Sequence, residues 1–296
     1  MLRHKQDRTT LLVSFSLFPL LPCLGIAKPE LLPLLVPLLV YSSYLSGVLS
    51  HYHVHNPIFT RRRWNEAYSW WLSAFYGFPV QAWIPTHNQN HHMYVNGPGD
   101  ATRSSEPDTL ITVFLYPLRS SAAQLPLLRA HVRALRERNR RVWRQWNCQI
   151  AAVATLQLGL AVWAIAAHGV RDGLLTYAAV GLGPMLFAPW AMMVTNYVQH
   201  VGCDPSSVDN HSRNFVGKIQ NRLVFNAGYH SVHHEHPHMH WSGYADLHAQ
   251  RALTMSPDLQ EQSVLGFFWK RYFASPDRFI NTSLRRFRSA VLRRET

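Results

Sequence analysis

The chain has 296 residues and carries 29 Lys and Arg against 16 Asp and Glu, although charged residues make up only 15% of it. A basic balance of this size is typical of proteins that meet nucleic acid, an anionic membrane surface or an acidic protein. The apolar residues are gathered in long blocks, which excludes an ordinary soluble domain, argues against a nucleic-acid partner and predicts a membrane protein.

Four blocks without charged residues have the length that a helix needs to cross a bilayer, roughly 20 residues. They form two pairs, and only a short turn separates the members of each pair, so we expect two helical hairpins. The first block follows a basic N-terminus, as the core of a secretory signal peptide does, but no clear cleavage motif separates it from the second. The blocks cover residues 9–27, 31–50, 149–168 and 173–198.

The segment between the hairpins has an aromatic part and a polar part. Residues 66–84 are aromatic and apolar but include Glu66 and Pro79, so we expect a helix that lies in the membrane interface or enters it part way. Residues 93–148 are polar and end in an Arg-rich stretch, Arg129–Arg144, whose charges recur all round a helix. This pattern predicts a helix that faces solvent or lipid headgroups.

The distribution of basic residues predicts the topology. Four crossings leave the N-terminus, residues 51–148 and residues 199–296 on one side, and only Lys28 and Arg171 fall in the opposite turns. Because basic residues favour the cytoplasmic side, both termini are expected in the cytoplasm. The predicted fold is therefore an all-α integral membrane protein, a single domain over 1–296 with four transmembrane helices in two hairpins and a cytoplasmic helical cap.

Histidines are gathered in three clusters on the predicted cytoplasmic side. HYHVH places two at i, i+4; HNQNHH places three at i, i+4, i+5; and GYHSVHH places three at i, i+3, i+4, which share one face of a helix. One further histidine follows the last apolar block. The candidate metal ligands are nine: His51, His55, His87, His91, His92, His200, His230, His233 and His234. Since a single tetrahedral zinc takes four ligands, nine imidazoles predict a di-metal site held by the cap.

The remaining histidines are interpreted as packed, outer or surface residues. His53 lies two residues from His51 and is expected on the opposite helical face. The histidines that alternate around Pro237 do not fit a continuous helix. They are His236, His238 and His240.

Iron suits this ligand set because neutral imidazoles can leave open positions on a redox-active metal, and a long apolar substrate explains a site at the membrane. A zinc hydrolase is an alternative on ligand type, but no HExxH helix or obvious catalytic base accompanies the clusters. A membrane metal-binding or metal-transport protein is a second alternative. Its ligands would be expected inside the spans, whereas here they lie outside them.

The three clusters resemble the histidine boxes of the membrane fatty acid desaturase superfamily, which also includes alkane and fatty acid hydroxylases. The flanking stretches HNQNHHMYVNGPGDAT and NYVQHVGCD are similar too, and the resemblance covers about residues 40–250. It implies an oxidoreductase with two iron ions and molecular oxygen as cosubstrate, acting on a fatty acid, acyl thioester or alkyl chain, with the nine histidines as ligands. Asn226 stands where some desaturases hold an Asn near the metal.

The product and the electron source are less defined. Three residues between His87 and His91 depart from the HxxHH spacing common in desaturases and are similar to alkane hydroxylases, whereas four spans fit a desaturase better. We predict desaturation, with hydroxylation or oxidative decarboxylation to a 1-alkene as alternatives. No HPGG, ferredoxin-type cysteine set or GxGxxG occurs, so a separate ferredoxin or cytochrome is expected, docking near Arg129–Arg144.

Overall fold

The computed structural model describes residues 1–105 and 108–274, and almost all of their regular structure is helical. The α-helices are α1 (Asp7–Ala27), α2 (Leu32–His55), α3 (Arg62–Tyr76), α4 (His92–Tyr94), α5 (Leu110–Arg138), α6 (Arg140–Tyr177), α7 (Gly183–His200), α8 (Lys218–Leu223), α9 (His230–Glu235), α10 (Tyr244–Arg251) and α11 (Val264–Phe268). The 3₁₀-helices are η1 (Pro29–Leu31), η2 (Val80–Ala82), η5 (Trp241–Gly243) and η6 (Pro257–Leu259), and the π-helices are η3 (Ile84–His91), η4 (Ala178–Leu182) and η7 (Trp269–Phe273). The strands β1 (Asn214–Phe215) and β2 (Gln260–Glu261) form one short parallel pair.

Three helical stretches of the described chain are long and apolar enough to cross a membrane: Asp7–Ala27, Pro29–His55 and Arg140–His200. The first two match the predicted first hairpin. The third has 61 residues and would be about 90 Å long as one straight helix, three times the thickness of a hydrocarbon core of about 30 Å. A single crossing by such a helix is not possible, so the chain must change direction within it.

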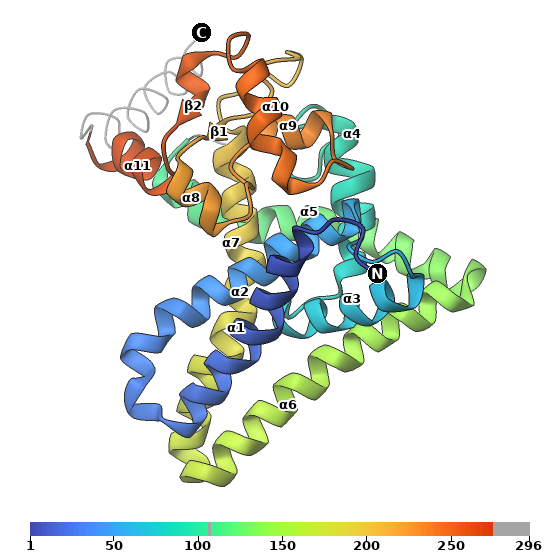
Figure 1. Cartoon of the computed structure of the whole chain (residues 1–296), viewed down its shortest axis with the longest axis vertical. Helices are drawn as coiled ribbons and strands as arrows, with labels where there is room; N and C mark the ends of the chain where they lie inside the picture. Colours follow the sequence, from blue (N-terminus) through green and yellow to red (C-terminus); the bar gives the residue numbers. More distant parts are fainter. Residues whose placement is uncertain (106–107, 275–296) are drawn as a thin grey trace, which may run out of the picture.

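That change of direction lies at Gly169, within the turn that the sequence predicted between its third and fourth blocks. Gly169 has a φ of 77°, in the left-handed region that favours glycine. A few residues later the chain has folded back on itself, because a Cβ on Gly173 would lie 2.5 Å from the Cα of Ile165. Figure 1 shows α6 running to one end of the molecule and α7 returning from it.

The two hairpins pack against each other through aliphatic side chains. Ile26 of α1, Leu39 of α2 and Ala164 of α6 belong to one buried cluster. On the outside, Leu34 and Leu158 are 74% and 66% exposed. A helix that is apolar on its packed face and on its open face suits a hydrocarbon environment rather than water.

The Arg-rich stretch corrects one prediction. A continuous helix over Arg129–Arg144 is wrong, because α5 ends at Arg138 and α6 begins at Arg140. Asn139 between them has φ −143° and ψ 78°, and its side-chain oxygen accepts a hydrogen bond from the backbone N–H of Val142. Asn is a favoured N-cap residue, so it ends one helix and starts the next. The helix of the third apolar block therefore begins nine residues before the predicted boundary at 149.

The elements that follow α2 and α7 in the chain, with α9 and α10 among them, form a cap at the top of Figure 1. The N-terminus lies at this end of the spans. Leu2 forms an antiparallel bridge with Phe59, and the N–H of Thr60 donates to the carbonyl of Met1 at 3.0 Å. The chain start is thus tied to the segment that follows α2. The C-terminus, predicted on the same side, lies outside the described residues.

Candidate metal centre

The end of α2 and the π-helix η3 supply the first four histidines. His51 and His55 are one turn apart on α2, so their rings leave the helix on the same side, with centroids 5.1 Å apart. His87 and His91 lie on η3, and their rings are stacked at 5.1 Å. A π-helix bonds residue i to residue i+5 and is often found at functional sites. The i, i+4, i+5 spacing of this cluster therefore fits a π-helix better than a regular α-helix.

The other histidines come from α7 and α9. His200 is the last residue of α7, and six-residue α9 begins with His230 and carries two more. The turn into α9 needs a glycine, because a Cβ on Gly228 would lie 2.2 Å from the carbonyl oxygen of Phe215. This close approach anchors the start of α9 on β1 and fixes where its histidines point.

The nine candidate ligands come together at the cap end of α2 and α7, and eight of them form two groups of four. Within each group the nearest ring nitrogens lie within 4.8 Å of one another. The first group is His51, His55, His87 and His233, and the second is His91, His200, His230 and His234. The three histidines of α9, expected on one face of a helix, are divided between the two groups.

His92 belongs to neither group of four but lies between them. Its Nε2 is 3.0 Å from the Nε2 of His87 and 3.0 Å from that of His233, both in the first group. Its ring centroid is 4.5 Å from that of His234 in the second. The ninth candidate ligand is therefore at the junction of the two groups.

The arrangement of ring nitrogens fits bound metal ions. The Nε2 atoms of His51 and His233 are 2.9 Å apart, and those of His200 and His230 are 3.0 Å apart. Two ligands at right angles around an ion at about 2.1 Å would be about 3.0 Å apart. The buried Nε2 atoms of His55 and His91 have no hydrogen-bond partner among the residues that the structure describes. An unpaired buried nitrogen costs about 1–3 kcal/mol, which a metal ion would remove.

The opposite ring nitrogens of three candidate ligands are held by protein groups. His91 Nδ1 lies 2.8 Å from Asp100 Oδ2, with 1% and 0% of the two side chains exposed. His200 Nδ1 donates to the carbonyl of His211 at 3.1 Å, and His233 Nδ1 lies 3.1 Å from the hydroxyl of Tyr244. Such partners fix the tautomer and leave Nε2 free to bind a metal.

Burial favours the neutral form of several of these imidazoles. Desolvation, reinforced by neighbouring histidines, lowers the pKa of His87, His230 and His234 well below its usual value. The same causes lower the pKa of His92 to about 2. Neutral imidazole is the form that binds metals, so these four candidate ligands are in the state that the chemistry requires.

Two histidines that were not counted as candidate ligands, His53 and His238, form hydrogen bonds with backbone carbonyls. His53 is buried and its Nε2 lies 3.1 Å from the carbonyl of Asn65, while its ring contacts Tyr68 edge-on. His238 Nδ1 donates to the carbonyl of His55 at 2.9 Å, which places it behind a candidate ligand.

Asn226 is held by a contact with the segment that follows α9. It has a φ of 61°, and its side-chain amide donates to the carbonyl of Trp241 at 3.1 Å. Among the described residues no ring nitrogen of the nine candidate ligands is among its hydrogen-bond partners. A role for Asn226 beside a metal stays a prediction that these contacts do not support.

Sequence reasoning missed Asp100, Tyr244 and the carbonyl of His211. The acidic residue of GPGDAT was visible, but nine residues separate it from His91, a spacing that no regular helix or strand explains. The chain reverses between them because Val95 and Asn96 adopt left-handed conformations, with φ of 41° and 64°. Only this turn brings the carboxylate back beneath the ring.

Comparison with known protein families agrees with this geometry. A family model described as "Fatty acid desaturase" matches residues 29–289, which is most of the chain. The protein belongs to the fatty acid desaturase family. Searches of curated proteins and of solved structures each found no match. Membership makes the protein a membrane oxidoreductase of the desaturase or hydroxylase type with a lipid or acyl substrate, and its histidine groups could hold metal.

In a member of this family, the substrate chain is expected to lie beside the histidines. One cavity of about 40 Å³ lies against His51 and His233, between α2 and α7. A larger one of about 320 Å³ is lined by polar and apolar residues of the segment from the end of α3 to η3, of α5 and of α7. The two share four lining residues, so they are adjacent. The shared residues are Trp83, His87, Met193 and Asn196.

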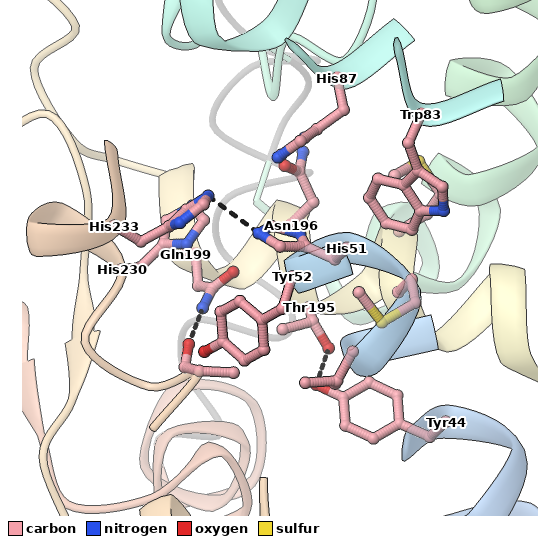
Figure 2. Close-up of a pocket in the computed structure, with 14 residues that line it drawn as sticks. Tyr44, His51, Tyr52, Trp83, His87, Thr195, Asn196, Gln199, His230 and His233 are labelled. Atoms are coloured by element: carbon pink, nitrogen blue, oxygen red, sulfur yellow. Dashed lines mark hydrogen bonds between the residues drawn. The ribbon is translucent and has the colours of Figure 1, made fainter. Parts of the chain in front are cut away.

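Figure 2 shows the smaller cavity with its histidines at one end. The opposite end is closed by Tyr44 of α2 and Thr195 of α7, whose hydroxyl groups lie 3.2 Å apart. Gln199, on the side of α9, donates to the carbonyl of Ala227 at 3.1 Å. The smaller cavity is therefore bounded on this side by the contact between α2 and α7; it is called the short arm below, and the larger cavity the long arm.

Proposed function

We propose that the protein is an oxygen-dependent di-iron fatty acyl desaturase that introduces a double bond into a long acyl chain. The observation that supports this most directly is that two adjacent cavities both have His87 in their lining. A chain lying in both arms would pass the histidines with carbons on either side. An internal pair of carbons, rather than a chain end, would then be nearest to the reacting centre.

The two arms differ in size, which bears on where the reaction occurs. A cavity needs about 10–15 Å³ of free volume to hold one water-sized group. The arm of about 40 Å³ thus holds about three such groups, and the arm of about 320 Å³ more than 20. The proposed double bond would therefore lie closer to the end of the chain that occupies the short arm.

In this proposal the two histidine groups and His92 hold two iron ions, which when bound would activate oxygen for removal of hydrogen from the chain. The neutral rings supply nitrogen lone pairs, and Asp100 and Tyr244 hold two of those rings in position. Trp83 and Met193 line both arms, pack against the chain and exclude water from it. Exclusion of water protects a reactive site from side reactions.

Two related reactions would begin with the same hydrogen removal. Hydroxylation of an alkyl or fatty acyl chain fits the same cavity if oxygen is transferred in place of the second hydrogen. Oxidative decarboxylation would bring a carboxylate beside the histidines. None of the described residues that line either arm is Lys or Arg, so this alternative lacks a partner for the carboxylate there.

The decisive experiment is identification of the product. The purified protein would be supplied with oxygen, a ferredoxin reducing system and fatty acids in free and thioester form, and products would be identified by mass spectrometry. A mono-unsaturated chain is the expected result. An alcohol or a 1-alkene would replace the proposal by one of its alternatives, and no oxygen-dependent product from any chain would refute it.

Metal analysis tests the cofactor separately from turnover. About two irons per chain are expected, because nine imidazoles are more than one ion needs. A site filled by zinc after expression with iron supplied would contradict the proposal and favour a metal-binding protein or a zinc enzyme.

We also propose four membrane crossings with both termini in the cytoplasm. The turn at Gly169 and the contact of the N-terminus with Phe59 support this arrangement. A reporter fused at residue 120 should appear in the cytoplasm. Its appearance on the far side would separate the histidine clusters by a membrane and refute the shared site.

An acidic ferredoxin or cytochrome is the proposed electron donor, and the end of α5 with the start of α6 is its proposed dock. Arg129, Arg133, Arg136 and Arg144 are exposed there, whereas Arg141 is paired with Glu66 at 2.9 Å. Attraction between exposed charges weakens with salt. Reduction of the protein by such a donor should therefore slow as ionic strength rises, and an unchanged rate would exclude this surface.

A further inference from the structure

A separate cleft of about 670 Å³ lies between the first hairpin and the segment around α8 and α10. None of the nine candidate ligands is among the described residues that line it. Tyr52 stands between the histidines and this region, and its hydroxyl donates to the carbonyl of Phe225 at 2.9 Å. The cleft is therefore a second feature of the molecule, outside the site assigned above.

The inner wall of the cleft is apolar and runs along the membrane-crossing helices. Thr9, Val13 and Leu17 line it from α1, and because they are four residues apart they form one stripe on that helix. Tyr41 and Leu45 line it from α2. Eight residues of helix rise about 12 Å, so the stripe extends well into the depth of a leaflet.

The outer rim of the cleft is cationic. Lys218 and Arg222 are one turn apart on α8, both are exposed, and neither has an ion-pair partner among the described residues. Their neighbours Ile219 and Leu223 are 81% and 51% exposed. Exposed apolar side chains next to cations are typical of a segment at the level of lipid headgroups.

Contacts with α2 hold this rim over the apolar wall. The hydroxyl of Tyr41 donates to the carbonyl of Leu223 at 2.7 Å, so the end of α8 is fixed to the helix that forms the wall. Figure 1 shows α8 beside α2, at the cap end of the hairpin. A cationic rim above the apolar wall of the cleft complements a molecule with an anionic head and a hydrocarbon tail.

We propose that this cleft binds one anionic phospholipid, with its phosphate at Lys218 and Arg222 and an acyl chain along α1 and α2. Basic residues near a membrane surface attract anionic lipids, and each contributes a roughly fivefold gain in binding. Two cations should therefore favour an anionic lipid over a zwitterionic one by an order of magnitude or more. The inference does not depend on the metals or on the reaction proposed above.

The test is titration of the delipidated full-length protein with phosphatidylglycerol or phosphatidylcholine, with bound lipid counted by native mass spectrometry. Phosphatidylglycerol should bind at least about tenfold more tightly. The double variant Lys218→Gln, Arg222→Gln should lose that preference. Val13→Trp, which fills the channel without changing charge, should weaken binding of both lipids.

The matched control removes the same charge elsewhere. Arg133→Gln, Arg136→Gln on α5 alters two exposed arginines and should leave the preference intact. An equal loss in this control would mean that general basic charge attracts the lipid, and equal binding of both lipids would overturn the role of the rim. Displacement of phosphatidylglycerol by inorganic phosphate at similar concentration would reduce the site to a phosphate site and also overturn the proposal.

Discussion

Replacing Asp100 is the sharpest test of how the cap positions its candidate metal ligands. Its Oδ2 faces His91 Nδ1 at 2.8 Å and accepts the backbone N–H of Asn96 at 2.7 Å. Its Oδ1 accepts both the backbone N–H and the hydroxyl of Thr102, each at 2.7 Å. One buried carboxylate therefore orients a candidate ligand and closes the loop behind it.

The charge of Asp100 matters as well as its shape. Desolvation by burial would raise the pKa of this carboxyl, but the hydrogen bond and charge of His91, with hydrogen bonds from Thr102, outweigh it and hold the pKa below its usual range. The carboxylate is thus ionised at neutral pH. In Asp100→Asn the amide keeps the volume, but one of the two oxygens becomes an NH₂ group that faces donors on its own side.

The expected size of the effect follows from these contacts. Loss of a group that orients a metal-bound histidine costs about 10- to 100-fold in metal affinity. Asp100→Ala also leaves several buried donors without an acceptor, and removal of one partner of a buried pair costs about 3–5 kcal/mol of stability. Asp100→Asn should therefore fold and bind metal poorly, whereas Asp100→Ala should also be clearly destabilised.

The assay measures metal per chain at limiting iron, together with the unfolding temperature. Asp204→Asn is the matched control, because Asp204 is exposed and bonded only to Ser206 among the described side chains. It should change neither quantity. Retention of normal iron affinity by Asp100→Asn would refute the argument that this carboxylate positions His91.

Three further predictions address the ligands, the cavity and the topology. His234→Ala should lower iron content by at least half, whereas His53→Ala should retain iron and lose only about 0.5–3 kcal/mol of stability. Tyr44→Ala should open the side of the short arm that Tyr44 closes and move the site of reaction away from the chain end held there. Tyr44→Phe keeps the ring and should leave the site of reaction unchanged. Identical product positions in both variants would contradict the proposed arm. Reporters fused after Lys28 and after Arg171 should both appear outside the cytoplasm, and a cytoplasmic signal at either would break the corresponding hairpin.

The spans and the histidine clusters could be predicted because they depend on local sequence. A block of about 20 uncharged residues has few structural options. Histidines at i, i+4 on α2 must share a side of the helix, so the joint exposure of His51 and His55 followed from spacing alone. Even the turn at Gly169 was visible, since it separates two such blocks.

The division of ligands between the groups could not be read from spacing. His230, His233 and His234 lie within five residues, yet His233 faces α2 and η3 while the other two face His200 and His91. That choice depends on where α9 is docked, through the contact of Gly228 with β1. Tertiary contacts of this kind leave no trace in a local pattern.

The other differences between the predictions and the structure have local causes that a helical sequence pattern does not reveal. Asn139 interrupts a run of good helix formers, because its side chain caps α6 more effectively than it continues α5. In the π-helix η3 each backbone hydrogen bond spans one residue more than in an α-helix, and no composition marks this change. Both features lie in the segment that connects the two hairpins.

The two histidine groups are built from shared elements, which has a consequence for single substitutions. Helix α9 supplies both groups, and η3 supplies His87 to the first and His91 to the second. His200 contributes only to the second group, where its Nε2 is 3.0 Å from that of His230. If the groups act as one unit, His200→Ala should lower iron below one per chain, because a displaced α9 also moves His233. A stable variant with one full iron would show instead that the second group can be lost alone and that the shared helix does not couple them.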